Sequence, residues 1–233
     1  MREATVLRAR MLSPQVRELT LDPGAGHTFV PGHWVTLYLD REGDEPLKRQ
    51  YSIASAPRAD GTFDIAVTLV PCGPMSTFLH EAKVGARIRM MDAQGLFVLE
   101  PMERPLLFVA TGTGIAPFRA MLQEIDKKAH AGTPLIMLFG CRSEEDLLYR
   151  DELEALAARW PRFRYLPTLS RPHDGWSLRR GWVQSHLPEL IAELGTDVDV
   201  YVCGLTKMVK DVRRICREEL GVDRKRVHVE RYD

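Results

Sequence analysis

The sequence has few cysteines, no net charge and no long apolar run. Its cysteines match neither a zinc site nor a disulfide framework, and no C-x₄-C-x₂-C run encodes an iron–sulfur cluster in these 233 residues. Lys plus Arg and Asp plus Glu both number 32, whereas a general nucleic-acid binder shows a basic excess. No stretch approaches the roughly 20 apolar residues of a membrane helix. We therefore expect no metal, no nucleic-acid partner and no membrane segment.

The first residues also lack the pattern of a signal peptide, because residues 1–21 carry scattered charges and no apolar core. The cysteines are widely separated, which fits a reducing compartment: Cys72, Cys141, Cys203 and Cys216. We expect a cytoplasmic location, and a monomer because no long exposed apolar helix is evident. The length allows two domains of roughly 100–130 residues.

The hydrophobic pattern changes near residue 101. Before it, short segments that often alternate apolar with polar residues are separated by glycine and proline, as expected of an antiparallel barrel or sandwich. A helix is expected over Ser76–Lys83. The expected strands are Thr5–Arg10, Gln15–Leu21, Trp34–Leu39, Gln50–Ile53, Phe63–Leu69, Arg87–Met91 and Gly95–Leu99.

After Pro101, continuous apolar runs alternate with helical patterns, which is typical of a parallel α/β sheet. We expect an all-β antiparallel barrel over residues 1–101 and an α/β parallel-sheet domain over residues 102–233. The expected strands are Leu106–Ala110, Leu135–Phe139, Phe163–Leu169, Val198–Cys203 and Val227–Val229, and the helices include Ser143–Trp160 and Trp182–Leu194.

A glycine-rich turn follows the buried strand Leu106–Ala110 and leads into a helix that carries Pro117 in its first turn. This context gathers backbone N–H groups and the positive end of a helix where a pyrophosphate can bind. The pattern is GxGxxP and not GxGxxG, so a purely structural turn is the alternative. The loop residues are Thr111, Gly112, Thr113 and Gly114.

No acidic residue ends the strand Leu135–Phe139, where it could bind a ribose 2′-hydroxyl. Arginines and a serine follow this strand and the next one, and they suit a 2′-phosphate. The alternative is that these arginines pair with Glu144 or Asp174 on the surface. The candidate residues are Arg142, Ser170, Arg171 and Arg180.

In the first half, the segment Arg49-Gln50-Tyr51-Ser52 offers a cation, an aromatic ring and a hydroxyl. Arg49 and Tyr51 are expected on one side of a strand, where a cofactor with a phosphate and a ring would match their spacing. Simple packing of Tyr51 is the alternative.

Together, these segments resemble the ferredoxin/flavodoxin–NADP⁺ reductase family over nearly the whole chain. Arg49–Ser52 is similar to its RxYS flavin motif, and the loop at 112–117 is similar to its NAD(P) loop. Three further segments match family motifs in the same order: Gly73-Pro74-Met75-Ser76 (GxxS), Cys203-Gly204 (the CG pair) and Glu230-Arg231-Tyr232 (the terminal ExY).

The resemblance implies a flavin-binding barrel, an NADP(H)-binding α/β domain and a role for each matched residue. Arg49 would bind the flavin pyrophosphate with the helix that begins near Met75 and Ser76. Tyr51 and Tyr232 would lie on opposite faces of the flavin ring. Ser52 would hydrogen-bond near flavin N5, with Glu230 near its side chain and Cys203 beside the nicotinamide C4. Gly140-Cys141-Arg142 and the segment Tyr149–Leu153 also resemble the NADPH domain of the diflavin reductases, and in that comparison Trp182 replaces an aromatic residue that packs on the adenosine.

The sequence departs from the family pattern in two places. Asp233 follows Tyr232, so the tyrosine is penultimate and its displacement by nicotinamide is expected to need more rearrangement. The segment Asp64–Val70 contains no aromatic residue to stack on the adenine of FAD. Since some relatives use FMN, this leaves FMN as an alternative to the favoured FAD.

The implied function is electron transfer between NADP(H) and a one-electron carrier such as ferredoxin or flavodoxin. Two alternatives remain at this point. One is an NAD(P)H-dependent reductase component of an oxygenase or haem-protein system, and the other is a non-catalytic flavin-bound relay or regulatory subunit. Basic residues such as Lys207, Lys210 and Arg213 could attract an acidic carrier, or could simply form a solvated helix face.

Overall fold

The computed structural model describes residues 1–128 and 132–232. The chain divides into two compact units. The first contains residues 1–99 together with residues 116–127, and the second contains residues 100–115 and 128–233. The units are defined by contacts between residues, and each of them contains two separate segments of the chain. The expected domain boundary between residues 101 and 102 therefore stays a prediction. Within the described residues, no helix is long and apolar enough to cross a membrane.

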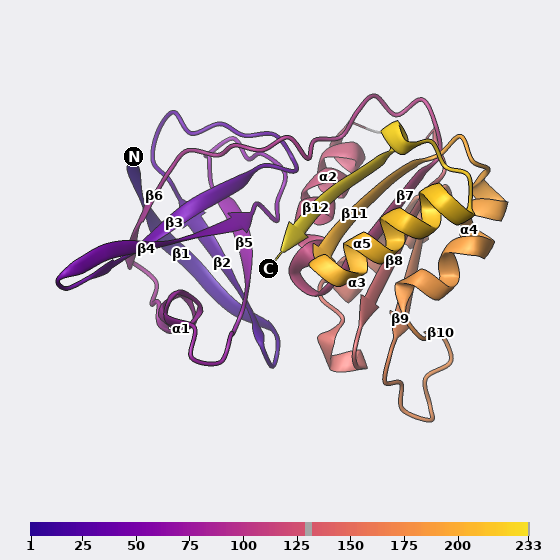
Figure 1. The fold of residues 1–233 in the computed structure, drawn as a ribbon. Helices are drawn as coiled ribbons and strands as arrows, with labels where there is room; N and C mark the ends of the chain where they lie inside the picture. Colours follow the sequence, from indigo (N-terminus) through magenta and orange to yellow (C-terminus); the bar gives the residue numbers. More distant parts are fainter. Residues whose placement is uncertain (129–131, 233) are drawn as a thin grey trace. The chain divides into compact units, whose positions relative to one another are not determined.

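The first unit is built on a six-stranded sheet in the order β4-β3-β6-β1-β2-β5, and its paired strands are antiparallel (Figure 1). The strands are β1 (Arg2–Ser13), β2 (Val16–Asp22), β3 (Trp34–Arg41), β4 (Asp44–Ser52), β5 (Phe63–Thr68) and β6 (Arg87–Met90). The edge strands meet where Ile53 bridges Ile65 and Ala54 N–H donates to the Asp64 carbonyl over 2.7 Å. This contact closes the sheet into a barrel.

Alternation along the strands places one face of this sheet inside the barrel. Val35 and Leu37 of β3 and Leu19 and Leu21 of β2 are all fully buried in its core. The expected strand at Gly95–Leu99 does not form, and Leu96 is 98% exposed. Its apolar residues suggested a strand, but only Gln94 makes a bridge to the sheet, through Trp34.

The second unit is built on a parallel six-stranded sheet in the order β10-β9-β8-β7-β11-β12 (Figure 1). Its strands are β7 (Leu106–Thr111), β8 (Leu135–Cys141), β9 (Phe163–Leu169), β10 (Arg179–Arg180), β11 (Asp199–Leu205) and β12 (Val227–Tyr232). One face of the sheet packs against helices through a buried aliphatic cluster that includes Val109, Leu138 and Val202. Near-continuous apolar runs predicted β7, β8 and β11, as is typical of strands in a parallel sheet.

The helices of the described chain are mostly short. They are α1 (Pro74–Glu81), α2 (Ala116–Lys127), α3 (Arg150–Arg159), α4 (Leu187–Leu194) and α5 (Thr206–Arg214), with short 3₁₀ or π turns η1 (Gly112–Ile115), η2 (Glu144–Asp146), η3 (Val183–His186), η4 (Ile215–Glu219) and η5 (Arg224–Arg226). The single helix expected over 143–160 is split into η2 and α3. Tyr149, with φ of 58°, adopts the left-handed conformation that separates them.

Candidate functional site

The order of the strands in the second sheet defines where its ligand site lies. From β7 the chain adds β8 and β9 on one side, and later adds β11 and β12 on the other side. The carboxyl ends of β7 and β11 therefore flank the point where the winding direction reverses. Ligands bind at such a switch point in open α/β sheets. Thr111 ends β7, and Cys203 and Gly204 lie at the end of β11.

Glycine is required at two positions of this switch point because the β7 and β11 ends approach closely. A Cβ added to Gly114 would lie 2.4 Å from the Cys203 carbonyl oxygen. A Cβ added to Gly204, where φ is +144°, would lie 2.4 Å from Thr111 Oγ1. A larger side chain at either position would separate the two strand ends. The structure thus brings together the predicted glycine loop and the predicted Cys-Gly pair.

The loop residues fit a dinucleotide. Thr111 Oγ1 is buried and has no hydrogen-bond partner among the described residues, so it can donate to a bound oxygen. Gly112 has φ of +54°, and a Cβ there would meet no heavy atom within 4 Å. The turn therefore has open space at Gly112, next to the Thr111 hydroxyl that has no hydrogen-bond partner among the described residues. The predicted Thr113 and Gly114 complete the same turn.

Cys203 and Glu230 are direct partners in the register of β11 and β12. Cys203 Sγ lies 3.8 Å from Glu230 Oε1 and is within donor range of that carboxylate. Complete burial, with a further contribution from the negative charge of Glu230, raises the pKa of the Cys203 thiol well above its usual value. Cys203 is therefore a protonated thiol near neutral pH. Tyr232 is near the same group, since it also hydrogen-bonds to the Cys203 side chain.

Three of the predicted 2′-phosphate residues lie together at the ends of β8 and β9. Ser170 N–H donates to the Cys141 carbonyl over 3.0 Å, and Arg171 N–H donates to the Arg142 carbonyl over 2.9 Å. The side chains of Arg142 and Arg171 are exposed and make no hydrogen bond or ion pair within the described chain. The alternative pairing with Glu144 is not observed, because Glu144 binds Arg150 and His173 instead.

Arg180 is placed differently from Arg142 and Arg171. Its Nη2 donates to the Trp176 carbonyl over 2.8 Å and also contacts the carbonyls of His173 and Asp174. This guanidinium therefore holds the 173–176 loop in place. Trp182, two residues later, is 70% exposed, which leaves its ring free to pack on a flat ligand.

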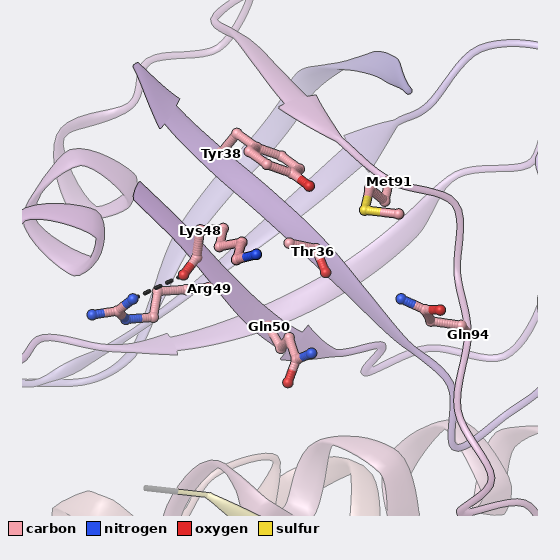
Figure 2. A pocket seen from close by; sticks show the side chains of 7 residues that line it. All are labelled: Thr36, Tyr38, Lys48, Arg49, Gln50, Met91 and Gln94. Carbon is pink, nitrogen blue, oxygen red and sulfur yellow. Dashed lines mark hydrogen bonds between the residues drawn. The ribbon is translucent and has the colours of Figure 1, made fainter. Parts of the chain in front are cut away.

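In the first unit, two predicted flavin residues line a pocket of about 380 Å³ (Figure 2). Arg49 and Gln50 of β4 contribute to it, and the Arg49 side chain also donates to the Lys48 carbonyl over 2.8 Å. The volume is within the range of small-ligand sites. The sequence analysis missed the remaining lining residues: Thr36 and Tyr38 of β3, Lys48 of β4, and Met91 and Gln94 after β6. None of these five residues belongs to a recognisable motif.

Tyr51 and Ser52 do not line this pocket. Tyr51 is half-buried against the barrel core, and this burial raises the pKa of its phenol to about 12, against an opposing effect of the Arg49 charge. The phenol therefore stays protonated at neutral pH. Ser52 is 6% exposed and pairs with Trp34 of β3, so its position is fixed by the end of the sheet.

The Gly73–Ser76 segment forms the start of α1. The Ser76 hydroxyl donates to the Gly73 carbonyl over 2.9 Å and accepts from Val70 N–H over 3.1 Å, so it stabilises the turn that leads into the helix. Met75 is buried. Their backbone N–H groups lie in the first turn of the helix, where helix geometry leaves N–H groups without an intrahelical partner. This turn fits a phosphate oxygen.

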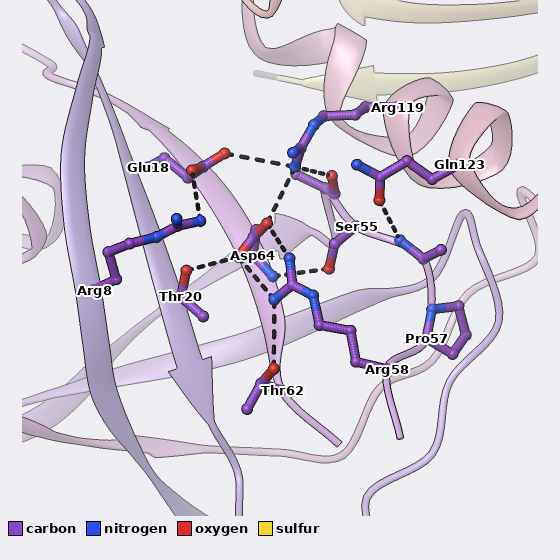
Figure 3. A network of polar contacts seen from close by, with 12 residues as sticks. Arg8, Glu18, Thr20, Ser55, Pro57, Arg58, Thr62, Asp64, Arg119 and Gln123 are labelled. Carbon is purple, nitrogen blue, oxygen red and sulfur yellow. Dashed lines mark hydrogen bonds and ion pairs between the residues drawn. The ribbon is translucent and has the colours of Figure 1, made fainter. Parts of the chain in front are cut away.

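A buried network of charged residues was also missed by the sequence analysis (Figure 3). Asp64 of β5 is fully buried and accepts from Arg58, Thr20 and Arg119. Glu18 of β2 is 1% exposed and lies 3.5 Å from Arg119 of α2. An acidic residue within a buried apolar strand was the available signal, because buried carboxylates need partners.

Comparisons with known proteins agree with this architecture. A model of oxidoreductase FAD-binding domains matches residues 3–98, and a model of oxidoreductase NAD-binding domains matches residues 108–214. These matches confirm the predicted fold class and the predicted cofactors at the level of a flavin and a nicotinamide dinucleotide.

Two curated relatives differ in how much of them the chain covers. The chain is 51% identical to ferredoxin–NADP reductase B of Sorangium cellulosum (strain So ce56), over 99% of this chain and 97% of that protein. It is 34% identical to the toluate 1,2-dioxygenase electron transfer component of Pseudomonas putida over 93% of this chain. The chain spans 63% of that second relative.

Solved structures share the fold over the whole chain. The flavohem-like FAD/NAD-binding domain of nitric oxide dioxygenase from Vibrio cholerae O1 biovar El Tor superimposes with a TM-score of 0.88 at 26% identity, covering 99% of this chain and 98% of that one. A ferredoxin NADP⁺ reductase from Neisseria gonorrhoeae superimposes with a TM-score of 0.84 at 24% identity, covering 98% and 97%.

Proposed function

The chain belongs to the ferredoxin–NADP⁺ reductase family of flavoproteins, as its motifs predicted, and we propose that it transfers electrons between NADP(H) and a separate carrier such as ferredoxin or flavodoxin. It is a flavin-dependent oxidoreductase. The observation that carries the proposal is the switch point of the second sheet, where the unpartnered Thr111 hydroxyl, Gly114, Cys203 and Glu230 come together.

In this proposal, the protein holds and orients the groups that react. Bound FAD supplies the redox chemistry that links two-electron exchange with nicotinamide to one-electron exchange with a carrier. Cys203 offers a neutral thiol to the nicotinamide because burial keeps it protonated. Ser52 would act on the flavin, and Glu230 and Tyr232 would act with Cys203 on the nicotinamide side. Tyr51 would pack on the flavin ring, and Arg49 with the first turn of α1 would hold the flavin phosphates.

The preference for NADP(H) over NADH rests on the loops after β8 and β9. Arg142 and Arg171 are exposed cations without a side-chain partner in the described chain, and Ser170 N–H donates to the carbonyl of Cys141, the residue before Arg142. An anion is the ligand that such a pair of guanidinium groups binds best. Glu144, which follows β8, is already paired with Arg150 and His173 and is not paired with either arginine.

The carrier is proposed to be acidic. Lys207, Lys210 and Arg213 form part of an exposed basic side of α5. Complementary charge of this kind speeds encounter between proteins more than it strengthens the final complex. A cytoplasmic location and a monomeric state stay predictions.

Anaerobic reduction of the purified holoenzyme tests the proposal. NADPH is expected to bleach the visible flavin bands much faster than NADH, and the reduced protein is expected to pass electrons to ferredoxin or flavodoxin. Bleaching by NADH alone would reject the 2′-phosphate assignment but keep the flavin. A protein that stays colourless after FAD is supplied would reject the proposal as a whole.

A second candidate function has support from the relatives. Several of them are named as electron transfer components of oxygenases, and the chain covers 56–65% of those proteins. In that role the electrons would pass to an iron–sulfur or haem group outside these 233 residues, which contain no cysteine cluster. Parallel assays with ferredoxin, flavodoxin and an oxygenase component as acceptors separate the two functions by their relative rates.

A further inference from the structure

Three side chains on one face of α2 bind the backbone of residues 54–57. Arg119 Nη1 donates to the Ala54 carbonyl over 2.8 Å, and Gln123 Oε1 accepts from Ala56 N–H over 2.9 Å (Figure 3). Lys127 Nζ donates to the Pro57 carbonyl over 2.7 Å. The three residues are four positions apart, and this spacing places them on a single stripe of the helix. We call them the α2 stripe.

One member of the α2 stripe, Arg119, is also bound by the buried carboxylates of Asp64 and Glu18. Arg119 Nη1 also contacts Asp64 Oδ2 at 3.1 Å and Glu18 Oε2 at 3.5 Å. Asp64 in turn accepts from Arg58 over 2.5 Å and from Thr20 over 2.8 Å. Because both carboxylates are almost fully buried, the guanidinium has strong partners that hold it against the Ala54 carbonyl.

The chain positions at the two ends of this contact are informative. Residues 54–57 follow Ser52 after one intervening residue, Ile53, and Ser52 ends β4 and belongs to the flavin motif. The helix α2 begins directly after η1, the turn that carries Gly112 and Gly114. The helix belongs to the first unit, whereas η1 belongs to the second. One short helix therefore runs from the dinucleotide loop to the segment that ends the flavin strand.

We propose that Arg119, Gln123 and Lys127 are positioning residues that couple the dinucleotide loop to the flavin strand. The inference rests on the proposed function, because it requires that NADP⁺ binds at the loop and FAD at the strand. A helix held at three points along its face moves as a rigid body. When NADP⁺ orders the loop, the helix also orders residues 54–57 and the adjoining strand. Bound NADP⁺ therefore increases the affinity of the protein for FAD. Linkage requires the reverse effect to be equal in size.

The test measures the dissociation constant of FAD with and without saturating NADP⁺, using flavin fluorescence of the full chain. We expect NADP⁺ to tighten FAD by at least about fivefold in the unaltered protein, the lower end of typical coupling between sites. In the double variant Gln123→Leu/Lys127→Met, this ratio is expected to fall below about twofold. The ratio reports coupling and is unchanged by a simple loss of FAD affinity.

Lys83→Met provides the matched control, because Lys83 is an exposed lysine of the same unit whose side chain makes no interaction within the described residues. In Lys83→Met, the ratio of the FAD dissociation constants without and with NADP⁺ should equal that of the unaltered protein. The single variant Lys127→Met removes one surface hydrogen bond and should fold normally, so it gives a partial loss of coupling even if the double variant is unstable.

Two results would overturn the inference while leaving the proposed function intact. One is a ratio near one in the unaltered protein, and the other is an unchanged ratio in both Lys127→Met and the double variant, in each case with NADP⁺ still perturbing the flavin spectrum. If NADP⁺ produced no spectral change and NADPH failed to reduce the flavin, the proposed function would fail together with the inference.

Discussion

Two groups of arginines in this protein have opposite surroundings. Arg58 and Arg119 in the first unit are bound to the buried carboxylate of Asp64, and Arg119 has a side chain that is only 8% exposed. Arg142 and Arg171 in the second unit are exposed, with side chains that have no partner within the described chain. The first pair satisfies a charge inside the protein, whereas the second pair offers charge to a ligand.

This difference separates structural from ligand-binding arginines by physical criteria. A guanidinium that is desolvated must already have its partners in the fold, because an unpaired buried charge is costly. A guanidinium that is solvated and unpaired loses little by meeting an anion and gains charge-assisted hydrogen bonds.

Replacing the carboxylate of the buried group should have the largest effect. Asp64→Asn removes the charge that neutralises Arg58 and Arg119, so the free energy of unfolding should fall by about 3–5 kcal/mol. Urea denaturation of the holoenzyme measures this loss. Glu3→Gln is the control, because Glu3 forms an exposed ion pair with Arg87, and such pairs contribute at most about 1 kcal/mol. Equal effects of the two substitutions would contradict the structural role of Asp64.

The same carboxylate predicts a dependence on pH. Burial alone would raise the pKa of Asp64, but hydrogen bonds from Arg58 and Thr20 and the charges of Arg58 and Arg119 hold it below the usual value. A lowered pKa stabilises the folded state above the unfolded-state pKa of about 3.9, and this contribution is lost as pH falls through the folded-state pKa. The stability difference between the unaltered protein and Asp64→Asn should therefore shrink below about pH 4. Denaturation curves at several acidic pH values measure it.

Removing an unpaired arginine should affect binding and leave stability unchanged. Arg171→Ala is expected to weaken NADPH binding by about 10- to 100-fold, the size expected for lost hydrogen bonds to a charged group, with little change for NADH. Titration of both nucleotides by difference spectroscopy measures this. Arg224→Ala is the control, since Arg224 is also exposed and its side chain is unpaired within the described residues. Equal losses for NADPH and NADH would remove the 2′-phosphate role.

Arg119 donates to the Ala54 carbonyl just after the flavin strand, and the residue that ends this strand should affect the rate of flavin reduction more than the binding of the flavin. Ser52→Ala is expected to slow flavin reduction by saturating NADPH by about tenfold, which corresponds to one lost hydrogen bond. Flavin content should stay nearly unchanged. Stopped-flow absorbance gives the rate and the visible spectrum gives the flavin content. An unchanged rate would exclude Ser52 from the reaction.

Replacing an exposed lysine of α5 tests whether an unpaired surface cation is enough to attract an acidic partner. Lys210→Gln should slow reduction of an acidic carrier by about two- to fivefold at low ionic strength, because a rim charge acts mainly on the association rate. The difference should disappear at high salt. Carrier reduction measured across a salt series tests this, and rates that do not depend on ionic strength would reject the docking role of this helix.

The local patterns of the chain were sufficient to predict most of the elements. Apolar runs predicted β7, β8 and β11, because a strand covered on both faces needs no polar side. The strand β9 was predicted as a further candidate that follows a helix. The split between η2 and α3 was not predictable, since the left-handed conformation that separates them is usually adopted by glycine and position 149 is a tyrosine. The two-residue strand β10 was also missed, because only its pairing with β9 defines it.

The candidate site was predictable where function leaves a local motif. The glycine loop, the Cys-Gly pair and the arginines after β8 and β9 were identified as short segments, and the structure brings the first two together at the end of the sheet. The α2 stripe and the lining residues Thr36, Tyr38 and Gln94 have ordinary local sequences. The stripe depends on contacts with a backbone segment that is distant in the sequence, and the pocket depends on which strands lie side by side. Local spacing in the sequence encodes neither.

The sequence by itself determined the fold class, the family and the identity of the nucleotide and flavin segments, because periodicity and glycine spacing act over a few residues. Only the tertiary structure decided which charges are neutralised and which stay available. Glu18, Asp64 and Arg119 are far apart in the chain, and folding joins them because buried charges must be paired. Arg142 and Arg171 share the same side-chain chemistry, but the fold leaves them in solvent without a partner among the described residues.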